Sequence, residues 1–71
     1  MINKNMLLGK MALNGYSQVQ LAHVIGMSRN TMNAKINGKR PFNTDEVIEI
    51  CKVLQITSDN EKLEIFLPYA S

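Results

Sequence analysis

The chain has 71 residues and a formal net charge of +2, with 45% hydrophobic and 20% charged residues. This length predicts one domain, and the composition excludes a disordered chain. The single cysteine, Cys51, excludes an internal disulfide. No apolar run approaches the ~20 residues that cross a bilayer, so we expect no membrane contact. The first residues, MINKNMLLGKMALNG, do not resemble a signal peptide, which predicts a cytoplasmic protein.

Charge is divided unevenly along the chain. All six acidic residues follow Thr44, whereas residues 1–44 carry basic side chains and no acidic ones. Such an asymmetry favours a polyanion as the partner of the first part, although a merely solvated surface would have the same composition. The basic residues of this part are Lys4, Lys10, Arg29, Lys35, Lys39 and Arg40.

Two short helices are predicted in the first third of the chain. Leu7, Leu8 and Met11 recur at helical spacing and predict a helix over about 4–13, with Asn3 as its cap. Asn14-Gly15 ends this helix. Ser17 is a favourable N-cap for a second helix over about 18–25. The inner face of that helix carries Leu21, Ala22 and Ile25.

A third helix follows closely. Gly26 ends the second helix, and Ser28 caps the third over about 29–37. Met32 and Ile36, four residues apart, form the core pair of this helix. Asn37-Gly38 stops it.

Two more helices complete an all-α chain. Asn43 and Glu46 have capping-box spacing and predict a helix over about 44–54. Ser58 and Glu61 repeat that spacing before a helix over about 59–67, which Pro68 closes. We expect one compact domain, residues 1–71, with these apolar residues inward: Val47, Ile48, Ile50, Cys51, Leu54, Leu63, Phe66 and Leu67.

The second and third predicted helices fit a helix-turn-helix. Two helices that meet near a right angle need a small residue where they approach, and Ala22 supplies it. The turn needs a residue that tolerates positive φ, and Gly26 supplies that. In this motif the second helix lies in the major groove of DNA.

The segment SQVQLAHVIGMSRNTMNAKINGKR, residues 17–40, resembles the helix-turn-helix of the phage-repressor family of the Cro/CI (XRE) type. In that family a Ser/Asn-Gln pair opens the first helix of the motif, LA…IG follows, and NGKR ends the second. The resemblance covers essentially the whole chain, because the lambda-repressor-like domain of this family also has five short helices. It implies a sequence-specific transcriptional regulator of a bacteriophage lysis–lysogeny switch, which binds double-stranded operator DNA in the cytoplasm of a bacterial host.

Shorter segments narrow the resemblance. LLGKM, NGKRPF and the short tail after IFLP look most like small regulators of temperate phages of Gram-positive hosts. That group includes Cro-like proteins and modulators of repression, which bind a partner CI-type repressor. A module that binds such a repressor, with DNA binding secondary, therefore stays open as an alternative function. An antitoxin of the same fold is a third alternative.

One position departs from the family. Lys35 stands where the family usually has an aliphatic residue, and the aliphatic residue here is Ile36. We therefore expect either a rotated core face or a different end for the third helix.

The predicted DNA contacts follow from placing Met32 and Ile36 inward. The guanidinium of an arginine matches guanine O6 and N7, and the amide of an asparagine matches adenine N6 and N7. The expected base contacts are Arg29, Asn30 and Asn33, with Ser28 near the DNA backbone. The resemblance implies a phosphate contact for Gln18. The basic cluster adds Lys35, Lys39, Arg40 and the backbone N–H groups near Asn43. The alternative for all of them is a solvated polar face.

The remaining candidate residues predict no chemistry. His23 is the only histidine and is expected on the surface, and Cys51 is expected to be buried packing. The sequence has no zinc-ligand spacing and no glycine-rich loop, so we expect no enzyme activity, no metal, no cofactor and no small-molecule substrate. Apolar residues outside the core pattern predict an interface with a CI-type repressor or a second copy of the chain. They are Val24, Ile65 and Tyr69, with the neighbouring Phe66.

Overall fold

The computed structural model describes residues 2–70, with side chains for residues 2–66. The described part of the chain forms five α-helices and no strand, which confirms the all-α prediction. Every helix begins at the residue where it was predicted to begin. The helices are α1 (Lys4–Leu13), α2 (Gln18–Ile25), α3 (Arg29–Ile36), α4 (Thr44–Val53) and α5 (Asp59–Ala70).

Three helix ends differ from the prediction. α3 and α4 each end one residue earlier than expected, within the usual scatter of helix boundaries. α5 continues to Ala70, so the prediction that Pro68 closes it is wrong. A proline removes one hydrogen bond of a helix, and in the last turn this loss does not force the backbone out of helical geometry.

Capping side chains fix the starts of the helices. The side chain of Asn3 accepts a hydrogen bond from the N–H of Met6 at 3.3 Å. Ser17 and Asn43 each form a complete capping box. Ser58 Oγ accepts from the N–H of Glu61 at 3.4 Å. These bonds satisfy donors that a helix leaves unpaired at its N-terminus, which is why the local sequence locates the starts so well.

The hydrophobic core draws on all five helices. Phe42 and Phe66 meet edge to face inside it, with ring centroids 6.2 Å apart at 87°. Eight large side chains are fully buried and supply most of the hydrophobic stabilisation. They are Leu7, Leu21, Met32, Ile36, Ile50, Leu54, Ile56 and Ile65.

The orientation of three side chains differs from the prediction. Ile48 and Leu63, predicted to lie inward, are 48% and 51% exposed. Ile65, predicted to lie at the surface, is completely buried. The backbone explains the last result, because the N–H of Asn3 donates to the Ile65 carbonyl at 2.9 Å and draws this turn of α5 onto the start of the chain. The predictions for the side chains of Leu67 and Tyr69 lie outside the described residues.

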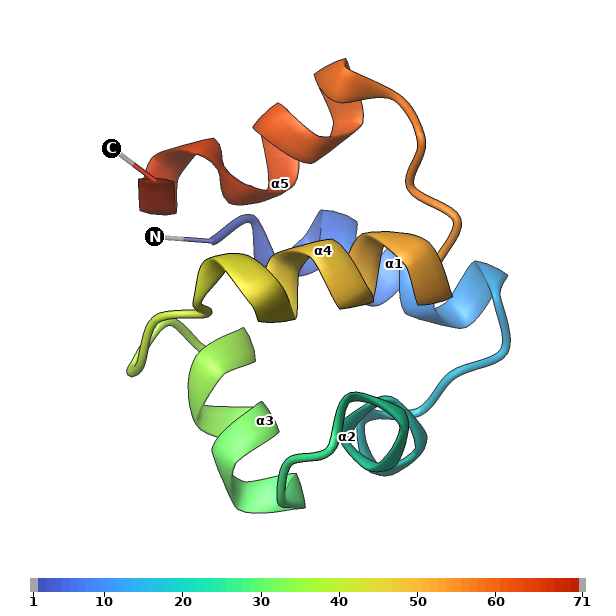
Figure 1. Ribbon diagram of the computed structural model, residues 1–71, viewed down its shortest axis with the longest axis vertical. Coiled ribbons are helices and arrows are strands. Elements are labelled where there is room, and N and C mark those ends of the chain that lie inside the picture. Colours follow the sequence, from blue (N-terminus) through green and yellow to red (C-terminus); the bar gives the residue numbers. More distant parts are fainter. Residues whose placement is uncertain (1, 71) are drawn as a thin grey trace.

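The helices are arranged around α4 (Figure 1). α4 crosses the middle of the molecule with α1 behind it, and α5 lies across one end, where it contacts α1. α2 packs against both α3 and α4. The α2–α3 pair forms the other end of the molecule, and the loop 37–43 returns the chain from α3 to α4.

Candidate nucleic-acid interface

The turn between α2 and α3 has the geometry of a helix-turn-helix. Gly26 adopts the left-handed conformation with φ 88° and ψ 34°, as predicted. The N–H groups of Gly26 and Met27 both donate to the carbonyl of Ala22 at 2.9 Å, which closes α2 and redirects the chain. Ala22 is buried, as predicted. In Figure 1 α2 is seen end-on while α3 runs within the plane, so their axes cross steeply.

α3 has one face in the core and one in solvent. Met32 and Ile36 are completely buried, which confirms the predicted core pair. Arg29, Asn30 and Asn33 are exposed. We call these three exposed residues the recognition ridge. Their side chains project from α3 into solvent.

Ser28 has a different role from its neighbours. Its Oγ accepts from the N–H of Thr31 at 3.1 Å and donates to Thr31 Oγ1 at 2.9 Å. The hydroxyl is therefore engaged in capping α3. Ser28 therefore positions the start of the recognition ridge, and its predicted contact with the DNA backbone stays a prediction.

A chain of hydrogen bonds joins α1 to the end of α3. Lys4 Nζ donates to Asn37 Oδ1 at 2.6 Å. The Nδ2 of Asn37 donates to the carbonyl of Asn33 at 2.8 Å and to Asn33 Oδ1 at 3.0 Å. One member of the recognition ridge is therefore held by two residues that sequence reasoning did not place in the site.

Lys35 is buried, which corrects its assignment as a phosphate contact. It is 8% exposed, and its Nζ lies 2.6 Å and 2.7 Å from the two carboxylate oxygens of Glu46. The ring of Phe42 lies 6.0 Å from the same nitrogen. Lys35 thus occupies the core-facing position that is usually aliphatic, with its charge paired. The core face of α3 is not rotated, because Met32, Lys35 and Ile36 share it.

Glu46 connects α3 to the start of α4. Its Oε1 also accepts from the N–H of Asn43 at 2.9 Å, and its own N–H donates to Asn43 Oδ1 at 2.8 Å. Burial raises the pKa of Glu46, but the hydrogen bonds from Lys35 and Asn43 and the charges of Lys35 and Arg40 outweigh it and leave the pKa below 4.5. The N–H of Asn43 is therefore occupied within the capping box, and the assignment of the other backbone N–H groups near Asn43 to phosphate stays a prediction.

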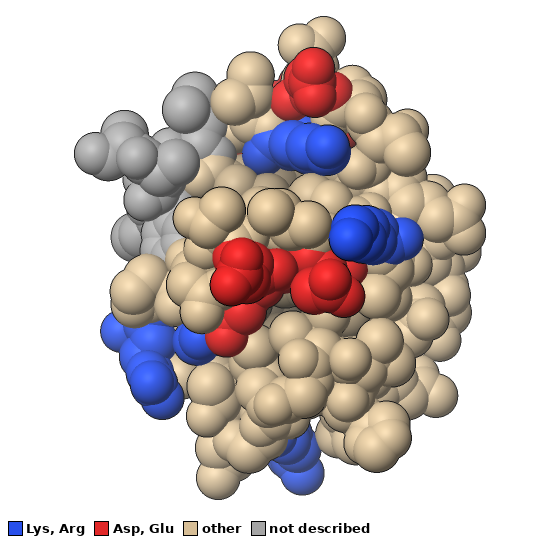
Figure 2. Space-filling model, in the orientation of Figure 1, with Lys and Arg blue, Asp and Glu red and all other residues tan. Residues whose placement is uncertain are grey.

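The other residues predicted to contact phosphate lie in the loop 37–43 and at the start of α2. Lys39 and Arg40 are exposed in the loop 37–43, and Gln18 is half-buried at the start of α2. Figure 2 shows basic side chains at this loop and near the start of α3, with acidic side chains gathered over α4 between the two ends of the molecule. Lys10 forms an ion pair with Glu61 and so adds little to the basic surface.

The predicted partner interface is only partly supported by exposure. Val24 is 49% exposed, but Ile65 and Phe66 are buried and present no side chain to a partner. Three of the exposed large apolar side chains of the described residues lie at the end of α1 and along α2, where Leu13 and Val19 are exposed as well as Val24. The absence of any Asp, Glu, Lys or Arg from residues 11–28 is the sequence signal that could have indicated it.

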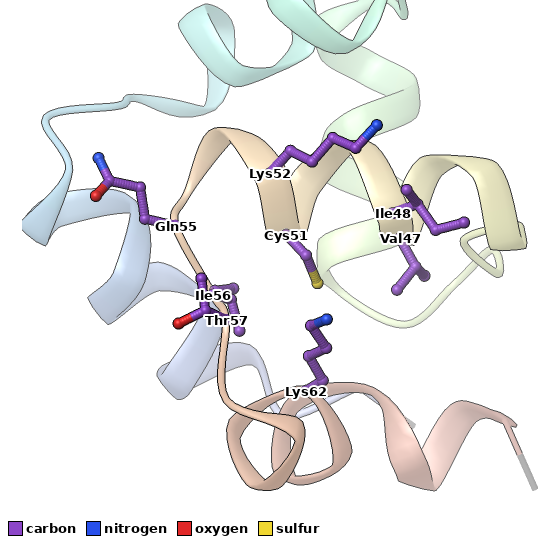
Figure 3. Close-up of a pocket in the computed structure, with 8 residues that line it drawn as sticks. All are labelled: Val47, Ile48, Cys51, Lys52, Gln55, Ile56, Thr57 and Lys62. Atoms are coloured by element: carbon purple, nitrogen blue, oxygen red, sulfur yellow. The ribbon is translucent and has the colours of Figure 1, made fainter.

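A surface hollow lies between α4 and the start of α5, and no residue of α2 or α3 lines it. Figure 3 shows the sulfur of Cys51 and the amine of Lys62 facing each other across it. Burial raises the pKa of the Cys51 thiol, and the charge of Lys62 only partly opposes this. Cys51 is buried, as predicted.

No group of three His, Cys, Asp or Glu side chains in residues 2–66 is placed to hold a metal ion. Within the described helices, none is both long enough and apolar enough to span a bilayer.

The turn, the buried crossing and the exposed ridge of α3 define a helix-turn-helix domain. The family model described as the Cro/C1-type HTH DNA-binding domain matches residues 6–59. The chain belongs to this family, whose members are DNA-binding regulators. Neither the curated proteins nor the solved structures contain a significant match to the chain.

Proposed function

We propose that the protein is a sequence-specific transcriptional regulator that places α3 in the major groove of operator DNA. The observation that carries this proposal is the exposure of Arg29, Asn30 and Asn33 together on the outer face of α3. A helix fits the major groove, and these side chains carry the donors and acceptors that distinguish base pairs there.

Phosphate contacts from the neighbouring segments position the ridge. Gln18 opens α2, before α3 along the chain, and Lys39 and Arg40 follow α3 in the loop before α4. Such contacts contribute affinity and orientation but carry no sequence information. A single domain reads one half-site, and two copies on neighbouring half-sites raise the affinity.

Binding to selected DNA tests the proposal. The full chain is used to enrich its preferred duplexes from a random library, and the affinity of the variants for these duplexes is then measured. We expect Arg29→Ala and Asn33→Ala each to weaken specific binding about tenfold. Asn60→Ala on α5 and Lys52→Ala on α4 are matched controls, because both residues are exposed and lie outside α2 and α3. If the controls and the ridge variants bind alike, the proposal is wrong.

The biological setting we propose is the lysis–lysogeny switch of a temperate phage in the cytoplasm of a Gram-positive host. The resemblance of LLGKM and NGKRPF to small phage regulators supports it. A repressor gene transcribed divergently from this one is the expected genomic neighbour. A toxin gene in that place would favour an antitoxin instead.

A second candidate function is binding to a CI-type repressor. The observation that favours it is the uncharged apolar surface of Leu13, Val19 and Val24, since exposed apolar patches mark partner surfaces. Val19→Asp and Val24→Asp are then expected to abolish capture of the repressor encoded beside the gene while leaving the fold intact. If capture persists in both variants, this surface is not the interface.

A further inference from the structure

The hydrogen-bond chain from Lys4 through Asn37 to Asn33 bears on which base Asn33 reads. An amide side chain has an acceptor oxygen and a donor nitrogen, and it presents one or the other according to its rotation. In this series of hydrogen bonds, Lys4 can only donate and the Asn33 carbonyl can only accept. These two partners therefore determine the rotation of each amide in turn.

The first step is set by Lys4. An ammonium group only donates, so the atom of Asn37 that faces it at 2.6 Å is the oxygen. The Nδ2 of Asn37 then points the other way, toward the Asn33 carbonyl at 2.8 Å. That carbonyl only accepts, so the two ends of the Asn37 amide agree on one orientation.

The second step is set by Asn37. The same Nδ2 lies 3.0 Å from the side chain of Asn33, and a donor at that distance requires an acceptor there. The oxygen of Asn33 therefore faces Asn37, and the exposed NH2 group of Asn33 is left to face outward. Lys4 lies in α1, 33 positions from Asn37, so only the tertiary fold establishes this arrangement.

We propose that Lys4 and Asn37 are positioning residues that make Asn33 a donor, so that it selects guanine or thymine rather than adenine. In the major groove guanine presents two acceptors, N7 and O6, and thymine presents O4, whereas adenine has one acceptor, N7, with the amino donor N6–H2 beside it. The usual pairing of asparagine with adenine also needs the amide oxygen to accept from N6, and here that oxygen is turned toward Asn37. This inference rests on the proposed function, since it assumes that α3 reads bases.

Base preference in selected duplexes tests the proposal. Libraries are bound by the full chain, and the position whose preference disappears in Asn33→Ala identifies the base that Asn33 reads. At that position we expect the wild-type protein to select guanine or thymine, and the enriched duplexes identify which of the two bases Asn33 reads. Lys4→Met and Asn37→Ala are expected to lower the preference over adenine about tenfold. Lys52→Met removes the same charge from an exposed site on α4 and is expected to leave the preference unchanged.

Asn37→Asp gives a sharper test. An aspartate keeps the acceptor for Lys4 but cannot donate to Asn33, so the amide of Asn33 is expected to rotate and turn its oxygen outward. The preference should then move to adenine or cytosine, which present amino donors. Comparing bases within one variant separates this shift from the general loss of affinity that a new negative charge causes.

The free protein provides a second measurement that needs no DNA. In NMR spectra of the side-chain amides, Lys4→Met is expected to shift the Asn37 and Asn33 NH2 resonances, whereas Lys52→Met should leave them unchanged. Unmoved resonances in Lys4→Met overturn the proposal, because the hydrogen-bond chain would then be absent.

The outcomes separate this inference from the proposed function. If Asn33 proves to read adenine or cytosine, or if Lys4→Met, Asn37→Ala and Asn37→Asp leave the preference unchanged, the inference fails while DNA recognition stands. If Asn33→Ala changes no position but Arg29→Ala does, the inference again fails alone. If no duplex is enriched, the proposed function fails and the inference fails with it.

Discussion

At the scale of single residues, the pairing of Lys35 with Glu46 determines how α3 is seated. A lysine at a core-facing position leaves a charge with little water around it, and such a charge needs a partner. Glu46 supplies that partner from α4 and at the same time completes the capping box with Asn43. α3 is therefore held against α4 by a polar contact as well as by apolar packing.

Breaking this pair from one side should destabilise the protein. We expect Glu46→Gln to lower the free energy of unfolding by roughly 2 kcal/mol, less than for a fully buried pair, because the side chains keep 10% and 18% of their exposure. Adding Lys35→Met should recover part of the loss, since no unpaired charge then remains. Urea denaturation of the wild type, the two single variants and the double variant measures the coupling between Lys35 and Glu46. Strictly additive changes in the free energy of unfolding would contradict that coupling.

The same carboxylate predicts a dependence of stability on pH. The pKa of Glu46 lies below its ordinary value of 4.5, so between the two values the unfolded chain binds more protons than the folded one. The stabilisation is complete above that ordinary value and is lost as the pH falls through the lower, folded value. Unfolding free energies measured across the acid range should therefore fall less steeply in Glu46→Gln than in the wild type. Parallel curves would show that Glu46 is not the group concerned.

At the scale of helices, the first residue of each helix and the tight turn between α2 and α3 were predictable from the sequence. Which face of α5 lies inward was not. Asn3, Ser17, Ser28 and Asn43 act on backbone donors within three residues, so a short segment contains the whole signal. The inward face of α5 depends on what packs against it. Its anchor, the bond from Asn3 to Ile65, joins residues 62 positions apart, and no periodic pattern contains that information.

Two glycines should respond oppositely to replacement by alanine. A Cβ at Gly26 would meet no atom within 4 Å, but the φ of +88° is strained for any L residue. Gly26→Ala should therefore lower the free energy of unfolding by about 1–2 kcal/mol. Gly9 lies inside α1 in equally open space, and Gly9→Ala should raise the free energy of unfolding by about 0.5–1 kcal/mol. Thermal unfolding of both variants tests this, and a Gly26→Ala variant as stable as the wild type or more stable would contradict the left-handed turn.

At the scale of the whole molecule, the separation of charge along the sequence is only partly retained in the fold. Of the basic residues in the first part, Lys10 and Lys35 are joined to acidic residues of the second part. The sequence analysis counted both lysines as basic surface, like Lys39, because ion pairs between distant segments cannot be read from the sequence. The basic surface that remains lies around α3 and the loop 37–43.

Salt dependence distinguishes the two kinds of lysine. Each phosphate contact contributes about 0.9 to the slope of log K against log salt concentration, so Lys39→Met should reduce the slope by about that amount. Lys10→Met should leave it nearly unchanged, because the ion pair with Glu61 already neutralises that side chain. Equal changes in slope for the two variants would show that the ion pair does not form in solution.

Interference by base methylation tests most directly whether the outer face of α3 enters the major groove. Dimethyl sulfate modifies guanine N7 in the major groove and adenine N3 in the minor groove. We predict that methylated guanines block binding of the wild-type protein to its selected duplex, and that Arg29→Ala loses this effect at one guanine while keeping it elsewhere. Interference confined to adenine N3, or a pattern that Arg29→Ala leaves unchanged, would contradict the account.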